Sequence, residues 1–247
     1  MSKKPILFNT EMVKAILNGR KTQTRRVIGN RFRITEFIPF NEEEKQEGYR
    51  FSIIDEKTNS KYDTVSLDFF TTYGFSNYKV GDILYVREPA KVVSPPVETC
   101  KKLTFKYLAD NKTTEIFLDD DFDYSKKWIQ KCQGVPNGCI KKMARIFLKV
   151  TNVRVERLQD IDTDNCISEG IVKYGGGQIA DTGCYGDAEY TIGEMQFDED
   201  EMYPISRIYN DDGEAFADLW NSTAKDGYKW EDNPYVFVYE FERVEND

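Results

Sequence analysis

The feature that most constrains the fold is a set of short runs in which apolar and polar residues alternate. Such alternation puts every second side chain on one face and is typical of a strand with one buried side. The clearest runs are KVGDILYVREPAKVV (79–93), KLTFKYLAD (102–110), TTEIFLDD (113–120), MARIFLKVTNVRVERL (143–158) and PYVFVYEFERV (234–244). We expect 102–110 to pair with 113–120, in a protein built mostly from antiparallel strands.

Only short helices are expected beside these strands. Residues 11–18 have one apolar face, with Thr10 as the predicted N-cap and Gly19 as the C-terminal stop. In IDTDNCISEGIV (161–172), Asp162 and Gly170 are predicted to have the same two roles. A third helix is expected in DDGEAFADLWNSTA (211–224). The pattern as a whole predicts an α+β fold.

The chain has no internal repeat and no convincing linker, so we expect one domain over residues 1–247. Two stretches fit the pattern poorly. Residues 30–78 are expected to form irregular strands or a hairpin insertion. Residues 172–212 are rich in glycine and acidic residues, and are expected to be an insertion or a mobile loop.

The net charge of −9 hides two strongly basic segments. Residues 3–33 and residues 126–157 each hold nine Lys or Arg residues and one acidic residue. If the two segments share a face, they would form a surface that binds a polyanion. The alternative is that these cations neutralise acidic neighbours within the fold.

The composition excludes several kinds of chemistry. Histidine is absent, which removes Ser–His and Cys–His nucleophiles and His-ligated zinc. Five cysteines without a Cys-x-x-Cys pair suggest reduced thiols in a cytoplasm, with no disulfide partner. No signal peptide or membrane-spanning run is found, and neither a metal nor a cofactor is expected.

Four blocks of sequence resemble the ASCH domain family, in the order that the family has them. They are ILNGRKTQTRR (16–26), VGDILYVRE (80–88), LQDIDTDNCISEGI (158–171) and NPYVFVYEFERV (233–244). The family signature Gly-x-Lys-x-x-x-x-Arg is matched by Gly19, Lys21 and Arg26. The resemblance is to longer, phage-type members, which implies a location in the cytoplasm of a bacterium or a phage-infected cell. It implies a PUA-like β-barrel with short helices at its rim, in which 30–78 and 172–212 are insertions.

The resemblance also implies a cleft for RNA or a single nucleobase. Small bacterial members of the family hydrolyse N4-acetylcytidine to cytidine and acetate. Their catalytic lysine, threonine and glutamate match Lys21, Thr24 and Glu169 here. Further residues expected to contact the substrate or RNA are Gly19, Arg20, Arg25, Arg26, Arg87 and Glu88. No cofactor is implied.

The proposed chemistry sets one geometric requirement. A threonine hydroxyl needs a base to take its proton, and without histidine the available base is the neutral amine of Lys21. On one continuous strand, Lys21 and Thr24 would point to opposite faces. The chain must therefore turn after Gly19 before any strand begins.

Other readings of these residues stay open. The arginines of GRKTQTRR (19–26) could bridge to acidic partners, Glu169 could pair with a nearby lysine, and Arg87 with Glu88 could be a structural ion pair. The alternative functions are a non-catalytic module that binds RNA or a modified base, and a ribonuclease. Aromatic residues that could stack on a base, although aromatics are more often core, are Tyr85, Trp128 and Tyr174.

Overall fold

The computed structural model describes residues 3–29, 32–38, 50–67, 69, 76–94, 101–119, 122–123, 125–175, 188–193 and 207–245. The chain divides into two compact units. The first consists of Met1–Lys21, Asp82–Lys149 and Glu242–Asp247, and the second of Thr22–Gly81 and Val150–Phe241. Each unit is assembled from segments that are distant in the sequence. The expectation of one domain over 1–247 stays a prediction.

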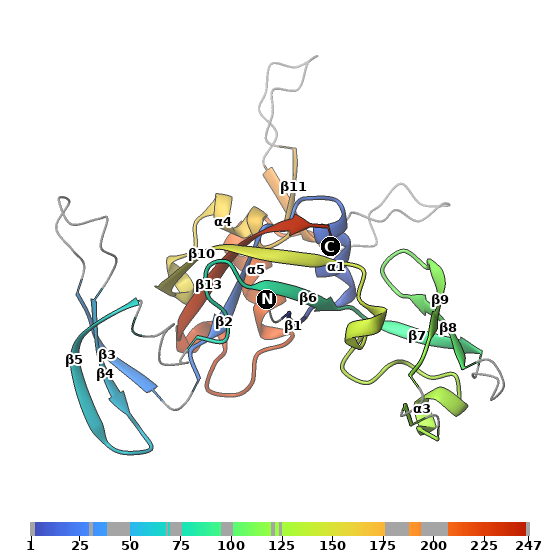
Figure 1. Ribbon diagram of the computed structural model, residues 1–247. Coiled ribbons are helices and arrows are strands. Elements are labelled where there is room, and N and C mark those ends of the chain that lie inside the picture. The colour runs from blue at the N-terminus through green and yellow to red at the C-terminus, as the bar shows by residue number, and fades with distance from the viewer. Residues whose placement is uncertain are drawn as a thin grey trace, which may run out of the picture. The chain divides into compact units, whose positions relative to one another are not determined.

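The first unit contains two groups of paired strands and short helices. Its elements are β1 (Lys4–Leu7), α1 (Thr10–Leu17), β6 (Ile83–Arg87), β7 (Ala90–Ser94), β8 (Lys102–Tyr107), β9 (Thr113–Phe117), α3 (Lys127–Gln130), the 3-10 helix Lys141–Met143 and the first residues of β10 (Phe147–Arg157). β6 pairs in parallel with β1 and antiparallel with β10. β7, β8 and β9 form an antiparallel sheet whose buried residues include Leu103 and Phe105 (Figure 1). The predicted pairing of 102–110 with 113–120 is confirmed.

The second unit holds the remaining elements. These are β2 (Gln23–Val27), β3 (Phe32–Ile38), β4 (Arg50–Asp55), β5 (Ser60–Ser66), most of β10, the 3-10 helix Leu158–Asp160, α4 (Thr163–Ser168), β11 (Ile171–Gly175), β12 (Ala188–Ile192), α5 (Asp212–Asn221), the 3-10 helix Trp230–Asp232 and most of β13 (Tyr235–Val244). β13 lies between β10 and β2, β11 pairs with β12, and β3, β4 and β5 form a separate sheet (Figure 1).

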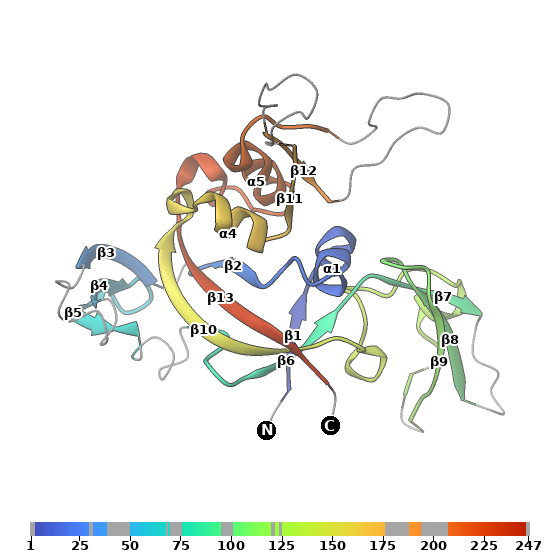
Figure 2. The same ribbon diagram turned by 90° about the horizontal axis from the view of Figure 1, so that it is seen from above.

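Helices α4 and α5 lie on one side of the β10–β13–β2 sheet (Figure 2). Both helices begin at an aspartate: Asp162 accepts a hydrogen bond from the amide of Asn165, and Asp211 accepts one from the amide of Glu214. α4 ends before Gly170, whose φ of 108° is easily adopted only by glycine. The sequence predictions for the two ends of α4 are therefore confirmed.

The structure confirms an α+β, strand-rich fold at the coarse level. In neither unit do the described strand pairings close into a barrel, so the PUA-like barrel stays a prediction. α1 starts one residue earlier than expected, because Asn9 rather than Thr10 accepts the capping hydrogen bond. Residues 30–78 contain β3, β4 and β5, whereas much of 172–212 lies outside the described residues. No described helix is long and apolar enough to cross a membrane.

Candidate functional site

The basic segment that follows α1 turns before it enters a strand. Gly19 has a φ of 74°, and the amides of Arg20 and Lys21 both donate to the carbonyl oxygen of Ala15. Strand β2 begins only after this turn. The requirement that Lys21 lie outside the strand that carries Thr24 is therefore met.

The three residues selected by the family resemblance are divided between the two units. Lys21 is the last residue of the first unit, where it is buried and its Nζ lies 5.6 Å from the ring centroid of Phe8. Thr24 in β2 and Glu169 at the end of α4 belong to the second unit. In the second unit, Glu169 pairs with Arg25, the residue that follows Thr24. Lys21 belongs to the first unit.

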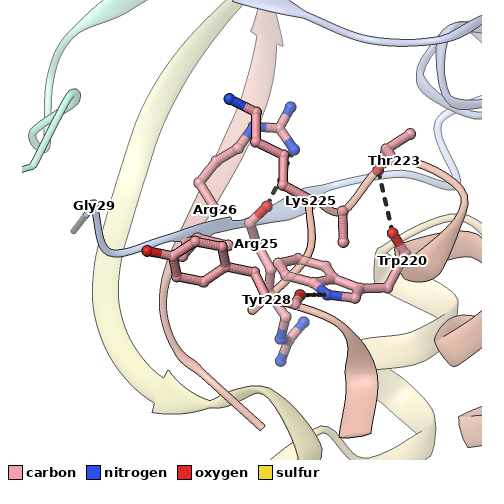
Figure 3. A pocket seen from close by; sticks show the side chains of 9 residues that line it. Arg25, Arg26, Gly29, Trp220, Thr223, Lys225 and Tyr228 are labelled. Atoms are coloured by element: carbon pink, nitrogen blue, oxygen red, sulfur yellow. Dashed lines mark hydrogen bonds between the residues drawn. The ribbon is translucent and has the colours of Figure 1, made fainter. Parts of the chain in front are cut away.

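Successive side chains of β2 point to opposite sides of the sheet. Gln23 and Arg25 share one side, and Thr24 and Arg26 share the other. Tyr239 of β13 lies directly opposite Thr24 and shares its side. Figure 3 shows the side chains of Arg25 and Arg26 leaving the strand in opposite directions. Arg25 and Arg26 are adjacent in the sequence, but their side chains therefore have different neighbours.

Arg25 is a buried ion-pair residue. Its Nη1 lies 3.1 Å from Oε1 of Glu169, and its Nη2 lies 2.9 Å from Oε2 of Glu156. Its guanidinium carbon lies 5.8 Å from the ring centroid of Phe216 in α5. One guanidinium thus neutralises carboxylates from β10 and from the end of α4. The alternative prediction, that arginines of residues 19–26 form ion pairs with acidic residues, is therefore confirmed for Arg25.

A second arginine, Arg154, extends the same network. It donates to the carboxylates of Glu156 and Glu240, and its Nη2 lies 2.9 Å from Oδ1 of Asn165 and 3.2 Å from Oε1 of Gln23. In this part of the second unit, cations neutralise acidic neighbours rather than forming an exposed basic face. Sequence reasoning did not select Arg154. The alternation within β10 was the one signal that placed it beside Glu156 on the strand.

The side-chain hydroxyl of Thr24 in β2 is buried and makes no hydrogen bond to a described residue. The residue is 1% exposed, and its Oγ1 has no hydrogen-bond partner in the part of the chain that the structure describes. The hydroxyl of Tyr239 opposite it is satisfied, at 2.8 Å from Oγ of Ser76. A buried unsatisfied polar group costs about 1–3 kcal/mol. Such groups are rare in native proteins, and a catalytic or ligand-binding role is one explanation for them.

A pocket of about 320 Å³ lies beside the second half of β2 (Figure 3). Arg26 lines it, and its Nη1 donates to the backbone oxygen of Arg25. Burial lowers the pKa of Arg26, while Glu169 and two tyrosines act in the opposite direction. Arg25 lines it as well. The remaining lining residues are Val27, Gly29, Trp220, Thr223, Ala224, Lys225 and Tyr228. None of these was selected from the sequence, because the contact of β2 with residues 220–228 has no local signal.

Arg87 and Glu88 belong to the first unit. Glu88 is fully buried and accepts hydrogen bonds of 2.8 Å from both Nε and Nη2 of Arg145, which also binds Asp110. Arg87 donates to backbone carbonyls, including that of Cys139. A structural ion pair is present, but the partner of Glu88 is Arg145 and not Arg87.

The aromatic residues proposed for base stacking have other surroundings. Trp128 packs against the buried core of the first unit. Tyr85 lies in β6 between β1 and β10, and Tyr174 lies in β11 opposite Glu189. The aromatic side chains that line the pocket beside β2 are instead Trp220 and Tyr228.

Comparison with protein-family models, curated proteins and solved structures finds no match to this chain. Among the described residues, no group of three or more Cys, Asp or Glu side chains is placed to hold a metal ion. Cys132, Cys139 and Cys166 are free thiols. Burial raises the pKa of Cys139 to about 12, so this thiol is a poor nucleophile at neutral pH.

Proposed function

We propose that this protein hydrolyses the amide bond of an N4-acylated cytidine, with Thr24 as the nucleophile. The observation that carries the proposal is the buried Oγ1 of Thr24, which has no hydrogen-bond partner among the described residues. A buried donor that the protein leaves unsatisfied is suited to act on a bound substrate. The resemblance to ASCH proteins supplies the reaction.

In the proposed reaction, a neutral amine takes the proton of Thr24 while Oγ1 attacks the acyl carbon; the family resemblance gives this role to Lys21. The C–N bond of the tetrahedral intermediate then breaks, and N4 leaves as the amino group of cytidine with the proton that the amine took. Water hydrolyses the acyl-threonine ester, which releases the carboxylic acid and restores the hydroxyl. The reaction consumes one water molecule and requires no redox partner.

Glu169 has a supporting role in this proposal. Arg25 holds its carboxylate at the end of α4, where its side chain is only 3% exposed. A fixed carboxylate at this position can assist proton transfer to the departing N4. Arg25 then acts through Glu169 and does not contact the substrate.

The test is incubation of the purified protein with N4-acetylcytidine, with chromatographic detection of cytidine. Thr24→Val keeps the shape of the side chain and should lower turnover by at least about a hundredfold. Thr22→Val, two positions earlier at an exposed residue, is the matched control and should keep full activity. Absence of turnover by the unaltered protein, or full activity of Thr24→Val, would contradict the proposal. Binding without turnover would favour the alternative, a non-catalytic module for RNA or a modified base.

A further inference from the structure

The pocket beside β2 is lined by both aromatic and positively charged side chains. Its lining includes the ring systems of Trp220 and Tyr228 and the cations Arg25, Arg26 and Lys225. No carboxylate lies among its described lining residues, although the chain has a net charge of −9. Figure 3 shows the two rings next to each other, with the Arg26 and Lys225 side chains on one side of them. Such a lining favours a flat unsaturated group that carries negative charge.

The wall of the pocket is held by hydrogen bonds. Nε1 of Trp220 donates to the carbonyl oxygen of Tyr228 at 2.8 Å. Nζ of Lys229 donates to the carbonyl oxygens of Asn221 and Ala224, at 3.0 Å and 2.6 Å. These bonds fix the loop between α5 and the next 3-10 helix, so a ligand has less loop entropy to remove. Lys229 also satisfies carbonyls at the negative end of α5, which would otherwise repel an anion.

The cations that line the pocket differ in their ion-pair partners. Arg25 is neutralised by Glu156 and Glu169 on the other side of the strand. Lys225 also lines the pocket; it is exposed and has no ion-pair partner among the described residues, so its charge can attract an anion from solvent. A volume of about 320 Å³ is near the lower end for small-molecule sites and suits one nucleotide rather than a chain of them.

We infer that this pocket binds a nucleoside monophosphate. The base stacks on Trp220 and Tyr228, and the phosphate lies beside Arg26 and Lys225. The inference does not depend on hydrolysis at Thr24, since none of the residues that carry it takes part in that chemistry.

Titration calorimetry with cytidine 5′-monophosphate, cytidine and inorganic phosphate tests the inference. The monophosphate should bind at least about tenfold more tightly than either of the other two, because only it engages rings and cations together. Lys225→Ala should weaken monophosphate binding about tenfold and leave cytidine binding unchanged. Lys127→Ala, which removes an exposed lysine of α3, is the matched control and should change neither.

A blocking variant gives a second test. A Cβ atom at Gly29 would meet nothing within 4 Å, so Gly29→Leu should fold and fill the pocket. It should abolish monophosphate binding with an unchanged unfolding temperature. Equal binding of monophosphate and phosphate, equal effects of the two lysine variants, or binding by a folded Gly29→Leu protein would each overturn the inference. Thr24→Val should keep monophosphate binding, so failure of the proposed hydrolysis is a separate outcome.

Discussion

The ion pairs of Arg25 allow a quantitative test of the role of the basic segment. Arg25→Met removes the guanidinium from two carboxylates, of which Glu169 has 3% and Glu156 has 23% of its side chain exposed. Removal of one partner from a buried ion pair costs about 3–5 kcal/mol, because the remaining charge stays in a low-dielectric environment. Glu156 keeps Arg154 and is nearer to solvent, so Glu169 dominates. We expect the free energy of unfolding to fall by about 3 kcal/mol.

A double-mutant cycle separates the ion pair from the packing of the side chain. Glu169→Gln alone leaves Arg25 paired with Glu156 and should cost about 1–2 kcal/mol. In the Arg25→Met protein, the same exchange removes a buried charge that has lost its ion pair with Arg25 and should restore about 1–2 kcal/mol. The two exchanges should therefore show a coupling energy of about 2–4 kcal/mol.

Urea denaturation followed by far-ultraviolet circular dichroism measures these differences, provided that the m-values agree. Arg33→Met is the control, because Arg33 pairs with Glu56 at 2.6 Å while both side chains are largely exposed. Loss of a surface pair of this kind should change stability by at most about 0.5 kcal/mol. An Arg25→Met protein no less stable than Arg33→Met, or strict additivity with Glu169→Gln, would refute the argument.

Three further predictions concern stability. Burial raises the pKa of Tyr239 from its ordinary value of 10.0 to about 12. The unfolded chain therefore loses this proton at lower pH than the folded protein, and the free energy of unfolding should fall between pH 10 and 12. Tyr239→Phe should lessen this fall, as measured by urea titration at pH 8 and 11.5. Glu88→Gln should destabilise the protein by about 2–4 kcal/mol by thermal unfolding without weakening nucleotide binding, because Arg145 stays half-buried beside a neutral amide. Asp162→Ala should cost about 1 kcal/mol by loss of the N-cap, whereas Asp162→Asn should cost less than half of that.

Features determined by a few consecutive residues could be predicted from the sequence. Gly19 and Gly170 both have positive φ and end short helices, and Asp162 caps α4 as expected. Alternating runs became β8, β9, β10 and β13 because their periodicity is that of a half-buried strand. The cap of α1 was wrong by one residue, since Asn9 and Thr10 are both good N-caps and the pattern does not rank them.

Features that depend on distant segments could not be predicted in the same way. Arg25 meets Glu156 and Glu169 across 131 and 144 residues, and no local pattern encodes that pairing. The pocket likewise joins β2 to a loop near residue 225. The family resemblance selected Thr24 and Glu169, whereas guanidinium chemistry alone suggested that Arg25 contacts the substrate. Neither source could predict that Arg25 is held by two carboxylates.

The pleat of β2 divides a basic segment into residues with different tasks. Both arginines line the pocket, but the guanidinium of Arg25 is bound to carboxylates of β10 and α4, whereas the side chain of Arg26 leaves the strand on the other side. Thr24 lies between Gln23 and Arg25 in the strand but shares the side of Arg26. Joint replacement of the arginines would mix loss of folding with loss of binding. Only single exchanges separate them: Arg25→Met should lower stability, and Arg26→Met should lower monophosphate affinity with a smaller change in stability.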